Sequence, residues 1–268
     1  MVGPLIGGLL SSRSYMILFV IDAFTSLVTA AIVFRLVPET KPEASSEQQE
    51  GMLQTLIGYR QVLGDRPYMA FLAVSMLMLL VYQQMYNTLS VYLRDVHDVT
   101  AQGYGLMLSL DAAVVVLFQF WVARKIRPYP PMLMMMVGTL FYLVGFTMYG
   151  FVATYTLFIV AIMLITVGEM VVMPVGQALV ARFAPEEMRG RYMAIFGLSW
   201  TIPSAVGPWA AGLILDNYNP NWVWYAAGII SSAAAAGFYL LHLRTRSWFA
   251  GEPGEVLAGD SSEAPALM

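Results

Sequence analysis

The chain has 268 residues, of which 59% are hydrophobic and only 12% are charged. Soluble domains carry about 25% charged residues, and one water-soluble core could not cover this much apolar surface. The net charge of −3 provides no basic field for nucleic acid, and the absence of Cys excludes disulfides and thiolate metal sites. His97 and His242 lack ligand-like spacing. The composition therefore indicates an integral membrane protein without a metal or other cofactor.

Apolar runs of about 20 residues, the length that crosses the hydrocarbon core, recur along the chain. They are continuous rather than alternating with period two, which favours helices over a β-barrel. A shorter run at residues 1–10 is typical of the end of a further helix. The seven full spans are expected at residues 15–37, 68–93, 104–123, 132–152, 155–180, 192–215 and 222–243.

Lys and Arg are unevenly distributed between the two sides of these spans. Twelve of the 14 lie in or beside the linker, the turns at 124–131 and 181–191, and the C-terminal tail, whereas Arg13 and Arg94 lie on the other side. The positive-inside rule places the linker and the tail in the cytoplasm. We therefore predict a multi-pass protein of the cell (plasma or inner) membrane.

The linker opens with a polar, acidic stretch that is typical of solvated chain. Farther along, Leu53, Leu56, Ile57 and Leu63 leave room for a short amphipathic helix on the cytoplasmic surface. The predicted organisation is the end of an N-terminal helical half at 1–37, a cytoplasmic linker at 38–67, a six-helix half at 68–243 and a disordered cytoplasmic tail at 244–268.

Two segments at opposite ends of the chain are similar to each other. Residues 2–10 read VGPLIGGLL, and residues 206–214, an offset of 204, read VGPWAAGLI. At this offset 15–37 also maps onto the last span, although chance similarity of apolar helices is the alternative. The counterpart of Tyr68 would lie about 136 residues upstream of Met1. We therefore expect an N-terminally incomplete bundle whose missing N-terminal helices are four more spans and the rest of a fifth, and no transport without them.

Parallel repeats of six helices are the architecture of the major facilitator superfamily. The pattern Gly3-Pro4-x-x-Gly7-Gly8 resembles the second half of the antiporter motif on the fifth helix of its drug:proton antiporters. Residues 38–40, PET, resemble the exit of the sixth helix, and 185–192 the loop between the tenth and eleventh. The loop at 123–127 departs from the family, since it lacks the Gly and Asp of the loop motif. The upstream Gly of the antiporter motif is not present.

The resemblance implies an all-α, polytopic major facilitator fold from a partial helix five to helix twelve. It also suggests functional roles for two sets of residues. The alternative role of the glycines and prolines is helix packing, and that of the arginines is to signal topology. Arg189 and Arg191 would latch the cytoplasmic gate. Antiporter-motif and packing residues, which would bias the carrier towards exchange, are Gly3, Pro4, Gly7, Gly8, Gly207, Pro208 and Gly212.

Polar groups at membrane depth are costly and usually face the bundle interior or a cavity. Glu169 sits near mid-span with no Lys or Arg within a turn, and Asp111 lies near the middle of its own span. These two are the proton-coupling candidates. Glu169 could instead remain protonated as a hydrogen-bond donor, or pair with a basic residue on a missing span.

Two helix faces supply the candidates for the substrate cavity. The first face belongs to the span at 68–93 and the second to the span at 155–180, and Trp200 is added from the span at 192–215. Interhelical hydrogen bonding is the alternative role for the amides. The cavity candidates are Tyr82, Gln83, Tyr86, Asn87, Thr166, Met173, Gln177 and Trp200.

These features predict a secondary active transporter that exports small amphipathic molecules by alternating access, coupled to protons. A proton-coupled importer of sugars or peptides on the same fold is the first alternative. A membrane receptor or enzyme is the second, and it lacks an H-E-x-x-H or similar cluster, while both Lys residues, Lys41 and Lys125, fall in loops. The expected partners are a small-molecule substrate, protons, the lipid bilayer and the N-terminal helices of the same transporter, with no nucleic acid.

Overall fold

The computed structural model of the chain describes residues 15–36 and 52–249. The described residues are helical almost throughout, and no strand occurs among them. The elements are α2 (Tyr15–Leu36), α3 (Met52–Gly64), α4 (Arg66–Tyr82), α5 (Gln84–Asn87), α6 (Leu89–His97), α7 (Ala101–Ile126), α8 (Pro131–Met148), α9 (Tyr155–Phe183), the 3-10 turn η2 (Glu186–Met188), α10 (Arg189–Asn217) and α11 (Trp222–Phe249).

Seven stretches of helix within the described residues are long and apolar enough to cross a membrane. They coincide with the seven spans expected from hydropathy, with ends that differ by a few residues. The all-α, polytopic fold is therefore confirmed. The expected stub at 1–10 and most of the tail lie outside the described residues.

The span expected as one helix at 68–93 differs in the structure, where it is divided into α4, α5 and α6. The cause is local hydrogen bonding by buried polar side chains. Gln84 Nε2 donates to the Leu80 carbonyl at 2.8 Å, and the Thr88 hydroxyl bonds the Gln84 amide oxygen. Such side chains compete with the backbone for partners and interrupt a regular helix.

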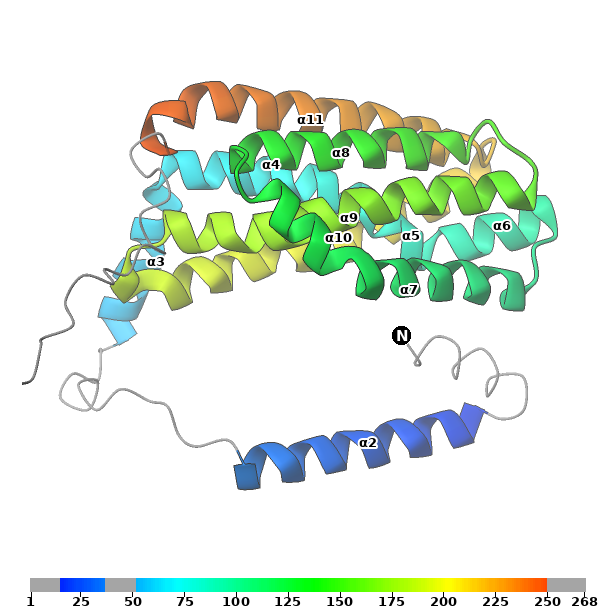
Figure 1. Cartoon of the computed structure of the whole chain (residues 1–268), viewed down its shortest axis with the longest axis horizontal. Coiled ribbons are helices and arrows are strands. Elements are labelled where there is room, and N and C mark those ends of the chain that lie inside the picture. Colours follow the sequence, from blue (N-terminus) through cyan, green and yellow to red (C-terminus); the bar gives the residue numbers. More distant parts are fainter. Residues whose placement is uncertain (1–14, 37–51, 250–268) are drawn as a thin grey trace, which may run out of the picture.

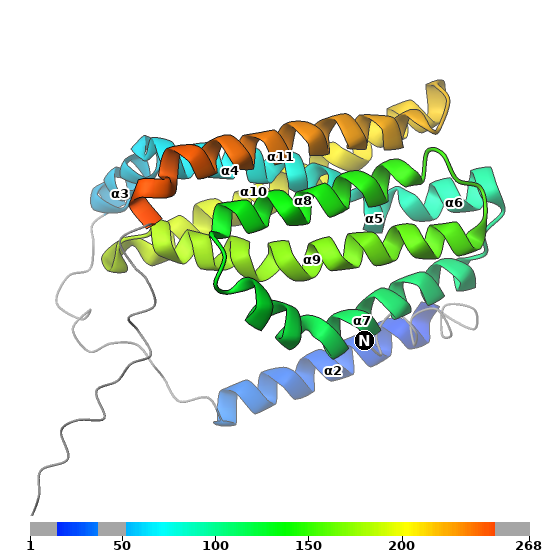
Figure 2. The same cartoon turned by 45° about the horizontal axis from the view of Figure 1, so that its top comes forward.

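The helices α4, α8, α9, α10 and α11 form the packed part of the bundle, and α7 lies at its edge against α9 (Figures 1 and 2). Only 17% of the apolar window of α7 is buried, compared with 50% for α9. The short helix α3 runs across one end of the bundle (Figure 1). Its position in the chain falls within the range where a short amphipathic helix was expected.

The helices α8 and α9 approach each other closely because glycines face each other across their contact. A Cβ atom on Gly168 would lie 2.7 Å from the carbonyl oxygen of Gly138 and 2.8 Å from the ring of Tyr142. A side chain there would collide with backbone, which cannot move aside. Small residues at helix contacts of this kind let backbones approach in membranes. The α8–α9 pair is therefore the rigid centre of the bundle.

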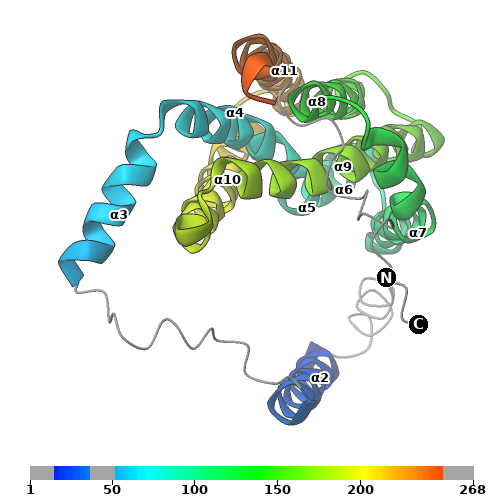
Figure 3. The same cartoon turned by 60° about the vertical axis from the view of Figure 1, so that its left-hand side comes forward.

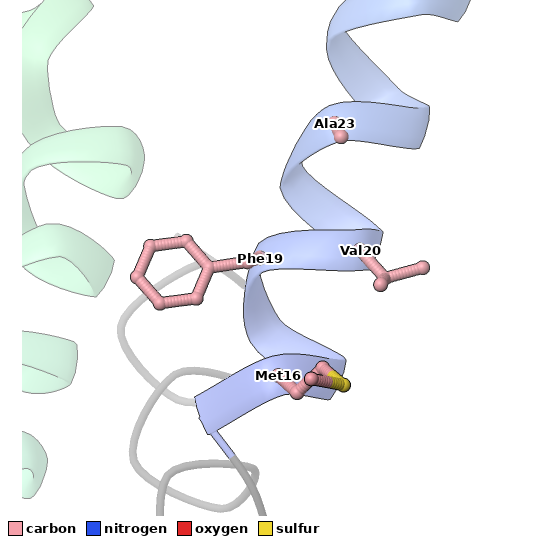
Figure 4. Close-up of a pocket in the computed structure, with 4 residues that line it drawn as sticks. All are labelled: Met16, Phe19, Val20 and Ala23. Carbon is pink, nitrogen blue, oxygen red and sulfur yellow. The ribbon is translucent and has the colours of Figure 1, made fainter.

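The helix α2 lies apart from the bundle (Figure 3). Every side chain of α2 whose exposure the structure describes is exposed. Four apolar side chains, those of Met16, Phe19, Val20 and Ala23, border an open concavity along it (Figure 4). This concavity offers no polar or charged side chain to a ligand, so it is not the candidate site.

Candidate functional site

A buried acidic group lies where α7 meets α9. Asp111, near the middle of α7, is only 5% exposed. Its carboxyl oxygen accepts a hydrogen bond of 2.6 Å from the Thr166 hydroxyl on α9. The same hydroxyl lies 2.8 Å from the Ile162 carbonyl of its own helix. The structure thus brings Asp111, a proton-coupling candidate, into contact with Thr166, a candidate for the substrate cavity.

Glu169 follows Thr166 by one turn of α9 and adds a second carboxyl group. Its Oε2 atom is buried without a hydrogen-bond partner among the described residues. Glu169 lies close enough to Asp111 for two negative charges to repel each other, and Tyr82 is its neighbour on α4. The ion pairs found in the described part of the chain, Arg94–Asp95 and Arg189–Glu186, include neither carboxyl group.

Aromatic side chains from four helices form a wall beside Glu169. Tyr82 stacks on Tyr142 of α8 with ring centroids 5.5 Å apart. It meets Trp200 of α10 edge-on at 6.2 Å, and its hydroxyl lies 3.1 Å from that of Tyr86 on α5. Tyr142 is fully buried, and its hydroxyl has no hydrogen-bond partner within the described ranges. Asp111 and Glu169, here called the acidic cluster, therefore adjoin the Thr166 hydroxyl on one side and these aromatic rings on the other.

A small cavity continues from this wall along α9. Its volume is about 20 Å³, which suffices for roughly one water molecule. Met173, Gln177 and Trp200, three of the expected cavity residues, line it. The described bundle therefore encloses only a narrow space beside these residues.

Other predicted cavity residues make only local contacts. Asn87 donates to the Gln83 carbonyl, one turn earlier, at 3.0 Å, and its side chain is exposed. Gln177 borders the small cavity but is otherwise exposed. The Asn87 amide therefore bonds within its own segment and makes no described hydrogen bond to Asp111 or Glu169.

Only some of the expected packing residues lie in the part of the chain that the structure describes. Gly3, Pro4, Gly7 and Gly8 lie outside the described residues. In α10, a Cβ atom on Gly207 would lie 2.6 Å from Gln84 Nε2, whereas nothing lies within 4 Å of one on Gly212. Pro208 stands inside α10, as does Pro203. Close packing in this helix is thus concentrated at Gly207.

The predicted gate residues lie at the start of α10. Arg189 forms a 3.8 Å ion pair with Glu186, a neighbour in its own turn, and both side chains are largely exposed. The Arg191 guanidinium covers Gly58 of α3. Nearby, Tyr192 donates to Asp65 Oδ2 at 2.8 Å, and the Tyr68 hydroxyl donates to the Tyr192 carbonyl at 2.7 Å. This tyrosine network, which ties α10 to the α3–α4 junction, was missed from the sequence.

The sequence analysis also missed Gln119. Its Nε2 atom donates to the Met170 carbonyl of α9 at 3.2 Å, a second hydrogen bond from α7 to α9. A signal was available, because Gln119 is the single amide in an apolar stretch and Pro174 follows Met170 by four residues. A proline leaves the carbonyl four positions earlier without its helical donor.

A bundle of apolar helices long enough to span a membrane, with acidic side chains at membrane depth and no ion pair to them among those described, defines a polytopic membrane protein. The chain belongs to the Major Facilitator Superfamily, whose sequence model matches residues 1–172 and 131–258. This is a family of transporters, not of enzymes.

Curated relatives extend the comparison. The chain is 25% identical to the uncharacterised MFS-type transporter YhjO of Bacillus subtilis (strain 168), over 85% of this chain and 55% of that protein. It is 23% identical to a Na(+), Li(+), K(+)/H(+) antiporter of Planococcus maritimus, over 77% of this chain and 54% of that protein. The chain thus spans about half the length of these relatives.

A solved structure shares the fold. A POT family transporter in complex with 5-aminolevulinic acid superposes with a TM-score of 0.60 at 14% identity, over 87% of this chain and 53% of that one. At this identity the likeness establishes the helical architecture alone.

Proposed function

We propose that this chain forms the proton-coupling part of a secondary active transporter that exports small amphipathic molecules in exchange for protons. The observation that carries the proposal is a pair of carboxyl groups, the buried Asp111 and the half-buried Glu169 with its enclosed Oε2 atom, with no ion pair to either among those described. Glu169 is the group we assign to proton binding, and Asp111 its partner.

The free-energy cost of an ionised carboxylate inside the membrane supports this assignment. An ionised acidic side chain at the centre of a membrane helix is unfavourable by about 2.5–3.5 kcal/mol on insertion scales. Glu169 can lose this cost either by binding a proton or by meeting water or a cationic substrate. A closed bundle therefore favours the protonated group, and an open one tolerates the ionised group. This difference couples protonation to the alternation between states.

The surroundings of the carboxyl groups support an amphipathic organic substrate. Tyr82, Tyr86 and Trp200 offer aromatic faces, which attract cations in desolvated sites. Met173 adds a thioether chain that adapts to ligands of different shape. An acid beside aromatic rings suits a molecule that joins a positive charge to an apolar body.

The test replaces Glu169 with Gln in the full transporter, meaning this chain with the N-terminal helices we expect upstream. The probe is tetraphenylphosphonium in proteoliposomes. Glu169→Gln should abolish proton-driven transport while retaining substrate binding and counterflow, because the amide keeps the shape but cannot exchange a proton. The control is Asp216→Asn, which changes an exposed carboxyl at the end of α10.

Unchanged proton-driven rate and pH profile in Glu169→Gln would remove Glu169 from the coupling step. The same vesicles report direction, since accumulation driven inward by protons would support the importer.

Monovalent metal cations are a second candidate substrate. Two unpaired carboxyl groups could accept Na⁺ or K⁺ in place of a proton, and one relative is a Na(+), Li(+), K(+)/H(+) antiporter. Addition of Na⁺ or K⁺ to proteoliposomes with an internal pH dye separates the candidates. Proton release driven by these ions and unaffected by tetraphenylphosphonium would favour metal cations.

A further inference from the structure

Among the described residues, three side-chain hydrogen bonds connect the edge helix α7 to α9, and two of them stand on either side of Glu169 along the chain. On one side, Thr166 donates to Asp111. On the other, Met170, the next residue after Glu169, accepts from Gln119 at 3.2 Å. The third joins the Tyr155 hydroxyl to the Gly103 carbonyl at 2.8 Å, near the other end of the contact. Since most of α7 is unburied, the two bonds beside Glu169 are the polar contacts that hold it against α9 at this level of the bundle.

The acceptor at Met170 is available because of a proline. Pro174 lies inside α9 and has no backbone N–H, so it cannot donate to the carbonyl four residues earlier. That carbonyl belongs to Met170. Gln119 supplies the missing donor from another helix, as membrane proteins commonly do at proline sites.

The orientation of Gln119 is distinct from that of its neighbours on α7. Phe118, Phe120 and Trp121 are 49%, 87% and 62% exposed, whereas Gln119 is half-buried. The amide therefore points towards the bundle while the adjacent aromatic side chains point away from it.

We infer that Gln119 is a positioning residue for Glu169. It binds the carbonyl that Pro174 frees and thereby fixes the backbone beside the Glu169 carboxyl relative to Asp111 on α7. The inference rests on the proposed function, in which Glu169 binds the proton. If the bond is broken, Met170 moves, and Glu169 moves with it because the two are adjacent in the chain.

The test is a double-mutant cycle in the full transporter between Gln119→Leu and Pro174→Ala. Alanine at 174 restores the helical donor to Met170, so Gln119 should then become dispensable. In the otherwise native protein, Gln119→Leu should shift the pH of half-maximal proton-driven transport by about 0.5 pH unit or more. In the Pro174→Ala background the same change should leave this pH unmoved. Gln102→Leu, at an exposed amide on α7, is the matched control.

A second measurement needs no transport. Dicyclohexylcarbodiimide modifies carboxylic acids at membrane depth, and mass spectrometry reports its rate of reaction at Glu169 in the purified protein. Gln119→Leu should change this rate about threefold or more, and the change should vanish in the Pro174→Ala background.

Two results would overturn the inference. The first is an equal effect of Gln119→Leu in both backgrounds. The second is a loss of thermal stability with no change in the pH profile or the labelling rate, which would make the amide a structural contact only. If Glu169→Gln keeps proton-driven transport, the proposed function fails, while the labelling cycle still decides whether Gln119 positions Glu169.

Discussion

Two of the helices that pack against α9 contact it in different ways. Against α8 it makes backbone-to-backbone contact, with Gly168 on Gly138. Against α7 it makes side-chain hydrogen bonds, through Thr166 and the Met170 carbonyl. A glycine contact has one closely packed geometry, because interiors of this density resist deformation. Hydrogen bonds donated by side chains can break and reform, so α7 is the partner with more freedom to move.

The candidate site lies where these two kinds of contact meet. Glu169 belongs to α9, Tyr142 to α8 and Asp111 to α7. Under the proposed function, Glu169 binds a proton between a fixed neighbour and a movable one, and its surroundings can change without unfolding its own helix. We therefore propose that the α8–α9 pair stabilises the bundle, while the α7–α9 contact rearranges when the transporter alternates between its states.

The largest effect should come from breaking the rigid contact. Gly168→Ala places a Cβ atom 2.7 Å from the Gly138 carbonyl oxygen, so the helices must separate. We expect a loss of about 2–3 kcal/mol of stability, measured as apparent Tm in detergent. Gly105→Ala on α7 is the control, because nothing lies within 4 Å of its Cβ position. Equal Tm values for the two variants would contradict the distinction.

A smaller effect should follow from breaking the movable contact. Thr166→Val keeps the shape of the side chain and removes the donor to Asp111, leaving a buried carboxyl without it. The expected loss of stability is about 1–2 kcal/mol. Thr201→Val, at an exposed threonine that bonds only within its own helix, should change the Tm little. A Thr166→Val protein as stable as this control would show that the bond adds nothing.

The stability of the fold should depend on pH through His97, at the end of the bundle where α6 meets the α8–α9 pair. Burial, beside the rings of Tyr92 and Phe158, lowers the pKa of His97 below its ordinary value of 6.5, and the Asp98 charge opposes this shift. The folded protein therefore favours the neutral imidazole, and the unfolded chain binds more protons just below pH 6.5. The stabilising contribution is complete above that pH and is lost as pH falls through it.

The measurement compares the Tm of the native protein with that of His97→Gln from about pH 7.5 to about pH 5.5. The native protein should lose more stability over this range than the variant. Parallel curves would show that His97 is not the titrating group.

The smallest effect on stability should come from Arg189→Ala. Its ion pair with Glu186 is exposed and local, and such pairs contribute less than about 1 kcal/mol. The Tm should therefore stay within a degree or two of the native value. If Arg189 latches the gate, the transport rate will change without a change in Tm, and labelling of cysteines engineered in the cavity will report it. An unchanged rate would reduce Arg189 to a topology signal.

Hydropathy predicted the seven spans well, because apolar length is a property that each segment carries by itself. It also located Asp111, Thr166 and Glu169, since polar residues stand out in apolar runs. The contact between Asp111 and Thr166 could not be predicted, because the two are 55 residues apart in sequence and their pairing depends on how α7 leans on α9.

The break in the span at 68–93 and the hydrogen bonds between helices were harder to predict for the same reason. The break at Gln84 arises from side chains that satisfy each other in three dimensions. The role of Gln119 could not be predicted because its acceptor, the Met170 carbonyl, lies on another helix. The tyrosine network at Asp65 joins segments about 127 residues apart, which no periodicity could show.

The contact between Gln84 and Gly207 has a consequence for how this family can change over evolution. The Gln84 amide occupies the space that any larger residue at 207 would need, and the same amide bonds Leu80 and Thr88. A substitution at 207 alone would displace it and leave those partners unsatisfied. In homologous sequences the two positions should therefore covary: a larger residue at 207 should accompany a shorter one at 84, and the threonine at 88 should be lost with it.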